Sequence, residues 1–296
     1  QLDATNIQNS GLIATSDELK LNAQGNINNN DGVINAGRID FTAENLSNDQ
    51  GKIEQSGQQQ LNIQAKKLDN SKGRVGQATK DNIGAGPSSG GVTSPTVTDP
   101  EQQSSAQDSS TVEVAPVGLT PKTFQVGHIQ IAEDISNVEG KILNNADIHL
   151  DVQDNIKNNA GEIQLPELQF NGQNFENQDG KFTANVVNLT ANNVDNQKGS
   201  IIASERFDLN AVQLNNSQGR LQSSQTLNLT STQLDNSEGQ IVAGHQFNLT
   251  ATQTNNNKGI IASIDSDAVL HVDHLNNTEG QISAQRVELV GQQLNN

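Results

Sequence analysis

The chain of 296 residues lacks cysteine, tryptophan, tyrosine and methionine, and its only aromatic residues are seven phenylalanines. Without cysteine there are no disulfides and no cysteine metal sites, which suits a chain that crosses an oxidising compartment unfolded. Hydrophobic residues make up 32% of the sequence, less than in most globular domains. Such polarity is also typical of disorder. The apolar residues, however, recur in fixed positions, and this regularity indicates a folded chain.

Basic residues are scarce, with 17 Lys and Arg against 34 Asp and Glu, for a net charge of −17. Nucleic acids and anionic membranes bind clusters of Lys and Arg, and the sequence has none, so we predict no nucleic-acid partner. No run of about 18 apolar residues is present, which predicts no membrane insertion. The first residues do not resemble a signal peptide. Both ends lie inside the repeat described next, so we expect a segment of a longer protein.

The motif Asn-x-x-Gly recurs about every twenty residues. From Gly140 onward, successive glycines are separated by 21, 19, 19, 20, 20, 20 and 21 residues. A shortened copy, Asn9-Ser10-Gly11, precedes the full copies. The asparagines of the full copies are Asn29, Asn48, Asn70, Asn137, Asn158, Asn177, Asn196, Asn216, Asn236, Asn256 and Asn277.

Apolar residues occupy constant positions around each glycine. The second residue after the glycine is apolar in every copy, and the fifth residue before it is apolar except at Thr254. Alternating segments such as Phe207-Asp208-Leu209 lie between these positions, and six of the seven phenylalanines fall in apolar slots. Alternation is the period of a β-strand, and Gly and Asn favour turns.

A repeat of this length with short strands predicts an all-β solenoid, specifically a right-handed parallel β-helix with roughly three strands per coil. Leucine-rich repeats have a similar period, but their dense leucine signature is missing. At about 4.8 Å per coil, roughly twelve to thirteen coils would extend about 60 Å. One coil buries too little apolar surface to fold alone, so each coil needs its neighbours.

Stacked coils would bring the repeated asparagines together at one corner. Their amides are expected to hydrogen-bond into a ladder along the axis. Asn, and Gly still more readily, tolerates the left-handed backbone that a sharp corner needs. A row of amides that binds a ligand is the less favoured interpretation.

The repeat is interrupted between Gly73 and Gly140. We predict solenoid coils over residues 1–77, a Pro/Gly/Ser-rich loop insertion over residues 78–122, and continuation of the same solenoid over residues 123–296. Proline cannot donate a hydrogen bond to a strand ladder. Five of the six prolines lie in the insertion: Pro87, Pro95, Pro100, Pro116 and Pro121. We expect a mobile decoration, with an ordered partner-binding arm as the alternative.

One group of side chains is a candidate metal site. His271, Asp273 and His274, near Asp265 and Asp267, could bind a metal only if three ligands converged, and a solvated strand face is favoured. We therefore predict no metal and no cofactor.

β-Helical polysaccharide enzymes need carboxylates that converge across coils. Asp69, Asp195 and Asp235 precede the glycine by four residues, but Asn215, Asn255 and Asn276 interrupt that file. The residue directly before the glycine has near-alternating charge, which we interpret as structural pairing between strands. These residues are Asp179, Lys198, Gln218, Glu238, Lys258 and Glu279. We predict no catalytic residues and no enzyme.

Two surface patterns complete the candidates. Thr230/Thr232 and Thr250/Thr252 form a Thr-x-Thr file, as in ice-binding β-helices, but it spans only two coils. Asn188, Asn228 and Asn248 lie in outward-facing Asn-x-Thr sequons, which arise easily in a chain so rich in Asn and Thr.

The stretch QLDNSEGQIVAGHQFNLTATQTNNNKGIIAS, residues 233–263, repeated with variation, resembles the haemagglutinin repeats of filamentous haemagglutinin and related two-partner-secretion exoproteins. The shared motif is Leu-x-Asn-x-x-Gly-x-Ile followed by an aliphatic-x-Leu-x-Ala strand, and it covers about 250 residues. The resemblance implies a secreted or surface protein of bacteria, exported unfolded through an outer-membrane transporter partner. Adhesins and contact-dependent growth-inhibition toxins both use such repeats.

From these observations we expect a structural shaft that projects an adhesive or toxin-delivery region from the cell. Its partners would be the neighbouring coils of the parent chain. The alternative is a module that itself binds a target-cell receptor or glycan; a polysaccharide-active enzyme is a weaker possibility.

Overall fold

The computed structural model describes residues 1–57, 59, 61–77, 127–143 and 148–296. Within these residues the chain forms strands and no helix. The predicted insertion, residues 78–122, lies outside the described residues. The strands are β1 (Leu2–Ala4), β2 (Ile7–Gln8), β3 (Leu12–Ala23), β4 (Asn26–Asn28), β5 (Val33–Thr42), β6 (Asn45–Ser47), β7 (Lys52–Gln55), β8 (Asn62–Asp69), β9 (Arg74–Gln77), β10 (Gly127–Ser136), β11 (Lys141–Leu143), β12 (Ile148–Val152), β13 (Asn155–Lys157), β14 (Glu162–Gln164), β15 (Glu167–Glu176), β16 (Lys181–Asp195), β17 (Ser200–Asn215), β18 (Arg220–Ser223), β19 (Thr226–Asp235), β20 (Gln240–Ala243), β21 (Phe247–Asn255), β22 (Ile260–Ser263), β23 (Ala268–Asn276), β24 (Gln281–Ser283), β25 (Val287–Val290) and β26 (Gln293–Asn295).

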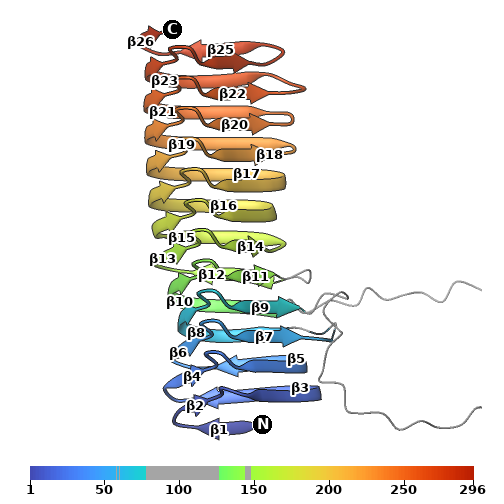
Figure 1. Cartoon of the computed structure of the whole chain (residues 1–296). Helices are drawn as coiled ribbons and strands as arrows, with labels where there is room; N and C mark the ends of the chain where they lie inside the picture. Colours follow the sequence, from blue (N-terminus) through green and yellow to red (C-terminus); the bar gives the residue numbers. More distant parts are fainter. Residues whose placement is uncertain (58, 60, 78–126, 144–147) are drawn as a thin grey trace, which may run out of the picture. The chain divides into compact units, whose positions relative to one another are not determined.

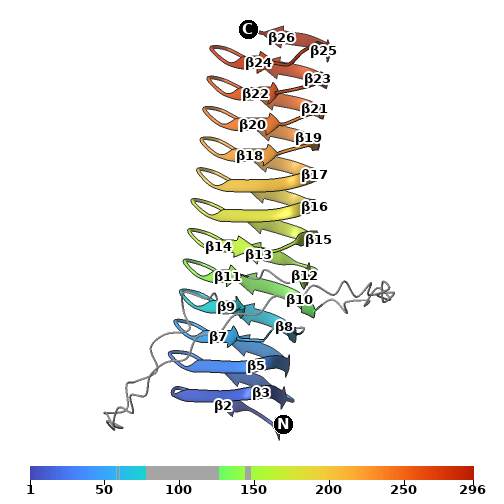
Figure 2. The ribbon, with the colours of Figure 1, turned by 90° about the vertical axis from the view of Figure 1, so that its right-hand side faces the viewer.

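Each coil has three sides, and the coils stack in chain order from the N-terminus to the C-terminus (Figure 1). In one coil, side A comprises residues 226–231, side B residues 233–235 and side C residues 240–243. Sides A and B meet at a bend within β19, whereas the Asn-x-x-Gly turn joins side B to side C. The same turns repeat along the stack (Figure 2).

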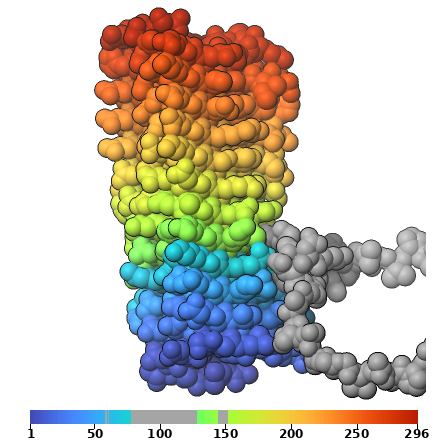
Figure 3. Space-filling model, in the orientation of Figure 1, coloured from blue at the N-terminus to red at the C-terminus, as the bar shows by residue number. Residues whose placement is uncertain are grey.

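Every strand pairs in parallel with its counterpart one coil away. In β19 and β21, for example, Leu227 lies opposite Phe247 and Leu229 opposite Leu249. In-register pairing places chemically similar side chains above one another, and the space-filling view shows coil following coil in the same order (Figure 3). The structure is a right-handed β-solenoid of about 12 turns with coils of ~20 residues, as the sequence predicted.

The core lies inside the coils and consists of the apolar slots identified in the sequence. The residue two after the corner glycine is fully buried in the middle coils, as at Ile201 and Ile241, and partly buried at Ile13 and Ile282 near the ends. The slot five residues before the glycine is buried throughout, including the polar exception Thr254. Six phenylalanines are among the largest buried side chains: Phe41, Phe170, Phe175, Phe182, Phe207 and Phe247.

The stack continues directly across the sequence interruption. Strand β10 pairs with β8, with Ile135 opposite Leu68, and β11 pairs with β9, with Ile142 opposite Val75. The strands on either side of the interruption are therefore consecutive coils of one solenoid.

Candidate functional site

The corner between sides B and C is a tight turn that every full copy of the motif repeats. In the copy at residues 236–239, the amide of Gly239 donates to the carbonyl of Asn236 at 3.0 Å, which closes a four-residue turn. The third residue, Glu238, has a positive φ of 57°. Positive φ at the third residue is the arrangement of type II turns.

The expectation that Asn or Gly takes up the left-handed backbone at this corner is wrong. The residue directly before the glycine does so in each full copy, with φ between 53° and 59°. These residues are Asp31, Gln50, Lys72, Glu139, Ala160, Asp179, Lys198, Gln218, Glu238, Lys258 and Glu279. All are exposed, so the turn constrains their backbone while their side chains remain in water.

The corner glycine is required by close contact rather than by a special φ. A Cβ atom on Gly239 would lie 2.2 Å from the carbonyl oxygen of Asn216 in the preceding coil and 2.6 Å from Oδ1 of Asn236. Real Cβ atoms do not approach other atoms so closely, so only glycine lets the two coils meet here. The same clash is found at the other full copies, whereas Gly11 in the shortened copy has nothing within 4 Å.

The corner asparagines form a continuous buried ladder along the solenoid. Nδ2 of Asn236 donates to Oδ1 of Asn256 at 2.7 Å, and Oδ1 of Asn236 accepts from Nδ2 of Asn216 at 2.7 Å. Nδ2 of Asn236 also donates to the carbonyls of Gly239 at 3.4 Å and Ile260 at 3.2 Å. Twelve such Asn-to-Asn hydrogen bonds, all between 2.6 and 2.8 Å, connect Asn9 to Asn296. The Asn ladder expected from the sequence is therefore confirmed.

The ladder contains all eleven asparagines named from the sequence. Those from Asn29 to Asn256 are completely buried, and Asn277 is 6% exposed. It also contains Asn9 and Asn296, which are not among those eleven. Asn9 belongs to the shortened copy, and Asn296 is the last residue of the given sequence. Their position in register with the ladder identifies them.

The haemagglutinin-repeat family model matches residues 1–71, 56–86, 121–160 and 167–296. These segments cover most of the chain. The protein belongs to the haemagglutinin-repeat family. The resemblance seen in the sequence is thus confirmed at the level of the repeat. No curated protein and no solved structure matches the chain. Haemagglutinin repeats are structural and adhesin repeats rather than an enzyme family, and their proteins are typically secreted or surface-exposed.

Outside the ladder, some of the residues that directly precede the haemagglutinin-repeat glycines contact one another between coils. Nζ of Lys258 lies 3.9 Å from Oε2 of Glu279, and Nε2 of Gln218 donates to Glu238 at 3.0 Å. The Lys258 and Glu279 side chains are more than half exposed, so water screens their attraction and the pair adds little stability.

The carboxylates considered for catalysis are each held by nearby donors rather than converging. Asp235 accepts from Nδ2 of Asn255 at 3.1 Å and from the amide of Ser237 at 2.9 Å. Asp195 accepts from Nδ2 of Asn215 at 3.1 Å, and Asp69 from the amide of Ser71 at 3.0 Å. These contacts are part of the repeat's own hydrogen-bonding pattern.

The candidate metal ligands lie on the outside of the solenoid. His271 and His274 are exposed, Asp273 accepts from Nε2 of Gln292 at 3.4 Å, and Asp267 accepts from Nε of Arg286 at 3.1 Å. Asp265 is exposed in the turn before β23. Among the residues that the structure describes, no three His, Cys, Asp or Glu side chains gather closely enough to hold a metal ion.

The two surface patterns from the sequence also face outward. Thr230, Thr232, Thr250 and Thr252 line a hollow of about 570 Å³ at the bend between sides A and B, together with unlike neighbours such as Val212. The sequon residues Asn188, Asn228 and Asn248 are half-buried on side A. Nδ2 of Asn248 donates to Oδ1 of Asn228 at 2.7 Å, so these two amides already have partners.

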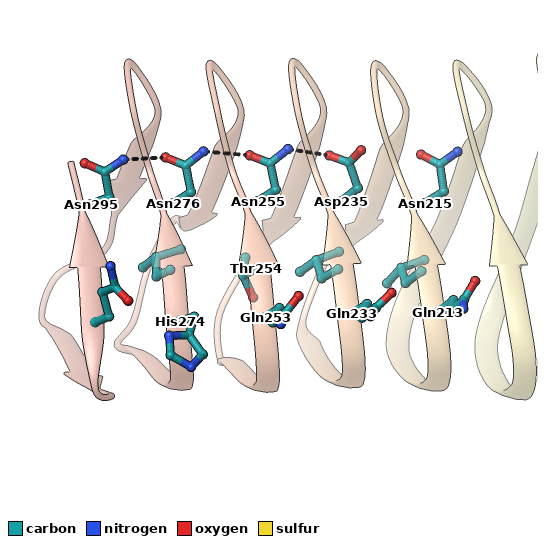
Figure 4. Close-up of a pocket in the computed structure, with 14 residues that line it drawn as sticks. Gln213, Asn215, Gln233, Asp235, Gln253, Thr254, Asn255, His274, Asn276 and Asn295 are labelled. Atoms are coloured by element: carbon teal, nitrogen blue, oxygen red, sulfur yellow. Dashed lines mark hydrogen bonds between the residues drawn. The ribbon is translucent and has the colours of Figure 1, made fainter.

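A cleft of about 550 Å³ runs across side B of the C-terminal coils and was not identified from the sequence (Figure 4). One row of side chains is mostly glutamine and the other mostly asparagine, and between them lies the buried slot that contains Leu234 and Thr254. The rows are Gln213, Gln233, Gln253, His274 and Gln293, and Asn215, Asp235, Asn255, Asn276 and Asn295. The repeated Gln-Leu-Asn pattern is the sequence feature from which the two rows of this cleft could have been predicted.

Asp134 and Glu162 are among the carboxylates whose pKa values are lowered because side chains of neighbouring coils donate to them. The hydrogen bond from Asn155 holds the pKa of Asp134 below its ordinary value, and Lys67 adds to the effect. Lys181 does the same for Glu162. Both shifts favour the charged forms that connect coils. The described residues contain no helix that is long and apolar enough to cross a membrane.

Proposed function

We propose that this haemagglutinin-repeat solenoid is a shaft segment of a large bacterial exoprotein and projects an adhesive or toxin-delivery region away from the cell. On this proposal the parent chain is exported unfolded through an outer-membrane transporter and folds outside. The observation that carries the proposal is the parallel stack of the described coils, which the buried Asn ladder follows from Asn9 to Asn296. Such a stack fixes the distance between its two ends.

Several features support a mechanical role over an enzymatic one. The carboxylates considered for catalysis are hydrogen-bonded within the repeat, as described for Asp195 and Asp235. The repeat family is one of structural and adhesin proteins. We therefore propose that the segment has no enzymatic activity of its own.

A coil replacement tests the shaft proposal. In the parent protein displayed on its cells, residues 217–236 would be replaced by the sequence of residues 197–216, which preserves the coil length and keeps an apolar residue in every core slot but changes the surface. A shaft should retain adhesion or delivery. Deletion of residues 217–256 should shorten the stack by about 10 Å and weaken the same activity. Loss of activity after the equal-length replacement would count against the shaft.

A direct binding module is the second candidate, and the cleft on side B favours it. The carboxamides of Gln213, Gln233 and Gln253 face the cleft without a hydrogen-bond partner, so they can donate to and accept from an uncharged ligand. On this alternative the chain binds target cells through a receptor or a glycan. Saturable binding of the isolated chain to target cells, lost on Gln233→Ala and Gln253→Ala but retained on the outward-facing Gln240→Ala, would support it.

We also propose that residues 78–122 are a loop insertion between two continuous blocks of coils, residues 1–77 and 123–296. Direct pairing of β10 with β8 supports this division. Replacing residues 78–122 by a short turn should leave the β signal in circular dichroism unchanged. Loss of that signal would show that the insertion is needed for the stack.

A further inference from the structure

Short amide ladders also run over the outside of the solenoid, between asparagines one coil apart. On side A, Asn248 donates to Asn228 at 2.7 Å and Asn228 donates to Asp208 at 2.7 Å. On side B, Asn193, Asn174 and Asn155 donate in turn, and the last of them reaches Asp134 at 2.7 Å. A third ladder runs from Asn295 through Asn276 and Asn255 to Asp235, with distances of 3.1 to 3.2 Å (Figure 4).

These outer ladders run in the opposite direction to the buried one. Each asparagine of the buried ladder donates to the following coil, as Asn29 does to Asn48. Each asparagine of the three outer ladders donates to the preceding coil, as Asn248 does to Asn228. One solenoid therefore contains amide ladders of both directions, and a single property of the coil geometry does not explain both.

The backbone fixes the direction of the buried ladder. Nδ2 of Asn29 also donates to the carbonyl of Gly32 at 3.2 Å and to that of Lys52, in the following coil, at 3.1 Å. A flipped amide would present Oδ1 to these carbonyls, leaving acceptors facing one another in a buried site. No such backbone contacts surround Asn228 or Asn174. In the third ladder, by contrast, the backbone amides of Asn257 and Thr278 donate to Oδ1 of Asn255 and Asn276 at 3.3 Å.

Each of the three outer ladders ends at an aspartate on its N-terminal side: Asp208, Asp134 or Asp235. A run of asparagines alone has equivalent pairings in either direction, because a flip exchanges donor and acceptor. An ionised carboxylate only accepts, so the amide beside it must point Nδ2 toward it. The oxygen of that amide is then left to accept from the next coil.

We infer that Asp208 and Asp134 set the direction of the two ladders that they end, and that their place at the N-terminal end is what this direction requires. The third ladder follows the same direction, but it does not distinguish the causes, because backbone amides also orient Asn255 and Asn276. Asp235 accepts from Asn255 but cannot donate to Asn215, and Figure 4 shows the hydrogen-bonded row ending between Asp235 and Asn215. Asn215 instead donates backwards to Asp195 at 3.1 Å and begins a second short ladder. The Asp and Asn residues of this file thus have a consistent order.

A competing explanation is that strand geometry alone makes surface amides donate to the preceding coil. The pair Asn45–Asn26 follows the same direction at 2.8 Å without a carboxylate. The two explanations differ in what happens when the carboxylate moves to the other end of a ladder. Carboxylate control predicts that the whole ladder reverses, whereas geometric control predicts that it breaks.

The side A ladder allows this test with the net charge preserved. Because Arg206 pairs with Asp208, every protein in the set would carry Arg206→Gln. Near pH 7, Asp208→Asn should lower the denaturation midpoint slightly, and Asn248→Asp should lower it more because both ends would then only accept. The double variant Asp208→Asn with Asn248→Asp should recover the midpoint of the Arg206→Gln parent. In it the new carboxamide at position 208 can donate to Asn228, and Asn228 can donate to the new carboxylate at position 248.

Side-chain amide signals in ¹⁵N-edited NMR give the second measurement. In the double variant we expect the new carboxamide at position 208 to be protected from exchange and that of Asn228 to remain so. Carboxylate control would be overturned in favour of strand geometry by two results together. The midpoint of the double variant would be lowered by the sum of the two single decreases, and the carboxamide at position 208 would exchange freely. Retained midpoints with backbone signals unchanged from the parent in all three variants would show that the ladder contributes nothing.

Discussion

The two turns that flank side C follow opposite rules. The Asn-x-x-Gly corner before side C keeps four residues in every full copy. The turn after it, which we call the C–A turn, spans residues 244–246 between β20 and β21 and residues 264–267 between β22 and β23. Residues 78–126, between β9 and β10, lie outside the described residues. In β16 and β17 the strand passes through this turn, and the register shifts between Ala184 and Val186.

The difference follows from what each turn must satisfy. At the corner, a buried amide must reach both neighbours, the third residue must adopt positive φ, and the fourth must have no Cβ. An extra residue would break all three conditions. In the coils whose C–A turn the structure describes, no buried side-chain ladder passes through it, so an insertion there mainly adds loop entropy, which grows slowly with length. Variation in a solenoid thus accumulates where no ladder passes.

Inserting one residue gives the largest expected contrast. A glycine inserted between Ser237 and Glu238 should destabilise the chain by about 3–6 kcal/mol, because two or more buried polar groups lose partners at roughly 1–3 kcal/mol each. A glycine inserted between His245 and Gln246 should cost less than about 1 kcal/mol. The next C–A turn already has one residue more. Equal unfolding free energies in urea would refute the contrast.

Removing one amide tests the corner alone. Asn236→Ala leaves Oδ1 of Asn256 without its donor and Nδ2 of Asn216 without its side-chain acceptor, and should cost about 2–4 kcal/mol. Asn248→Ala removes one hydrogen bond on a half-buried surface and should cost less than about 1 kcal/mol. Thermal and urea unfolding of both variants measure the difference. A similar loss for both would mean that burial adds nothing to the ladder.

The corner glycine gives a smaller effect with a change of sign. Gly239→Ala places a methyl group against Asn216 and should destabilise by about 2 kcal/mol, the usual cost of overpacking. Gly11→Ala meets nothing within 4 Å, and it should be neutral or stabilising by up to about 1 kcal/mol because the unfolded chain loses freedom. If both variants lose stability equally, close contact is not the reason for glycine.

The constant features of the coil could be predicted from the sequence because the chain repeats them many times. The slots of Ile201 and Leu214, the buried ladder and the parallel stacking all follow from residue types that recur at one period. A structural role could not be predicted in this way where the residue type at that position changes from coil to coil. The positive φ belongs to residues as different as Lys258 and Ala160, whose side chains point into water and give no composition signal.

Features that depend on register required the structure. The Gly239 clash involves Asn216 of the preceding coil, and the order of Asp235 and Asn255 has a meaning only once the two are known to be hydrogen-bonded. The sequence showed the same alternation of Asp and Asn and suggested only an interrupted row of acids. Residues 78–122 lie outside the described part of the chain, so their predicted mobility stays a prediction.

The smallest effect concerns Thr254, which occupies the leucine slot leading into the constant corner at Asn256. It lies in register with Leu234 and Leu275, and its hydroxyl oxygen is buried without a hydrogen-bond partner. Thr254→Val keeps the shape and replaces the unpaired hydroxyl by a methyl group, so it should stabilise the chain by about 1 kcal/mol. Thr254→Ala should destabilise, because it leaves a cavity, and Thr252→Val on the exposed face of the same strand should change little. Urea midpoints of the three variants measure these effects. A loss of stability in Thr254→Val would mean that the hydroxyl has a partner at this position, such as a buried water. This coil would then differ from its neighbours for a structural reason.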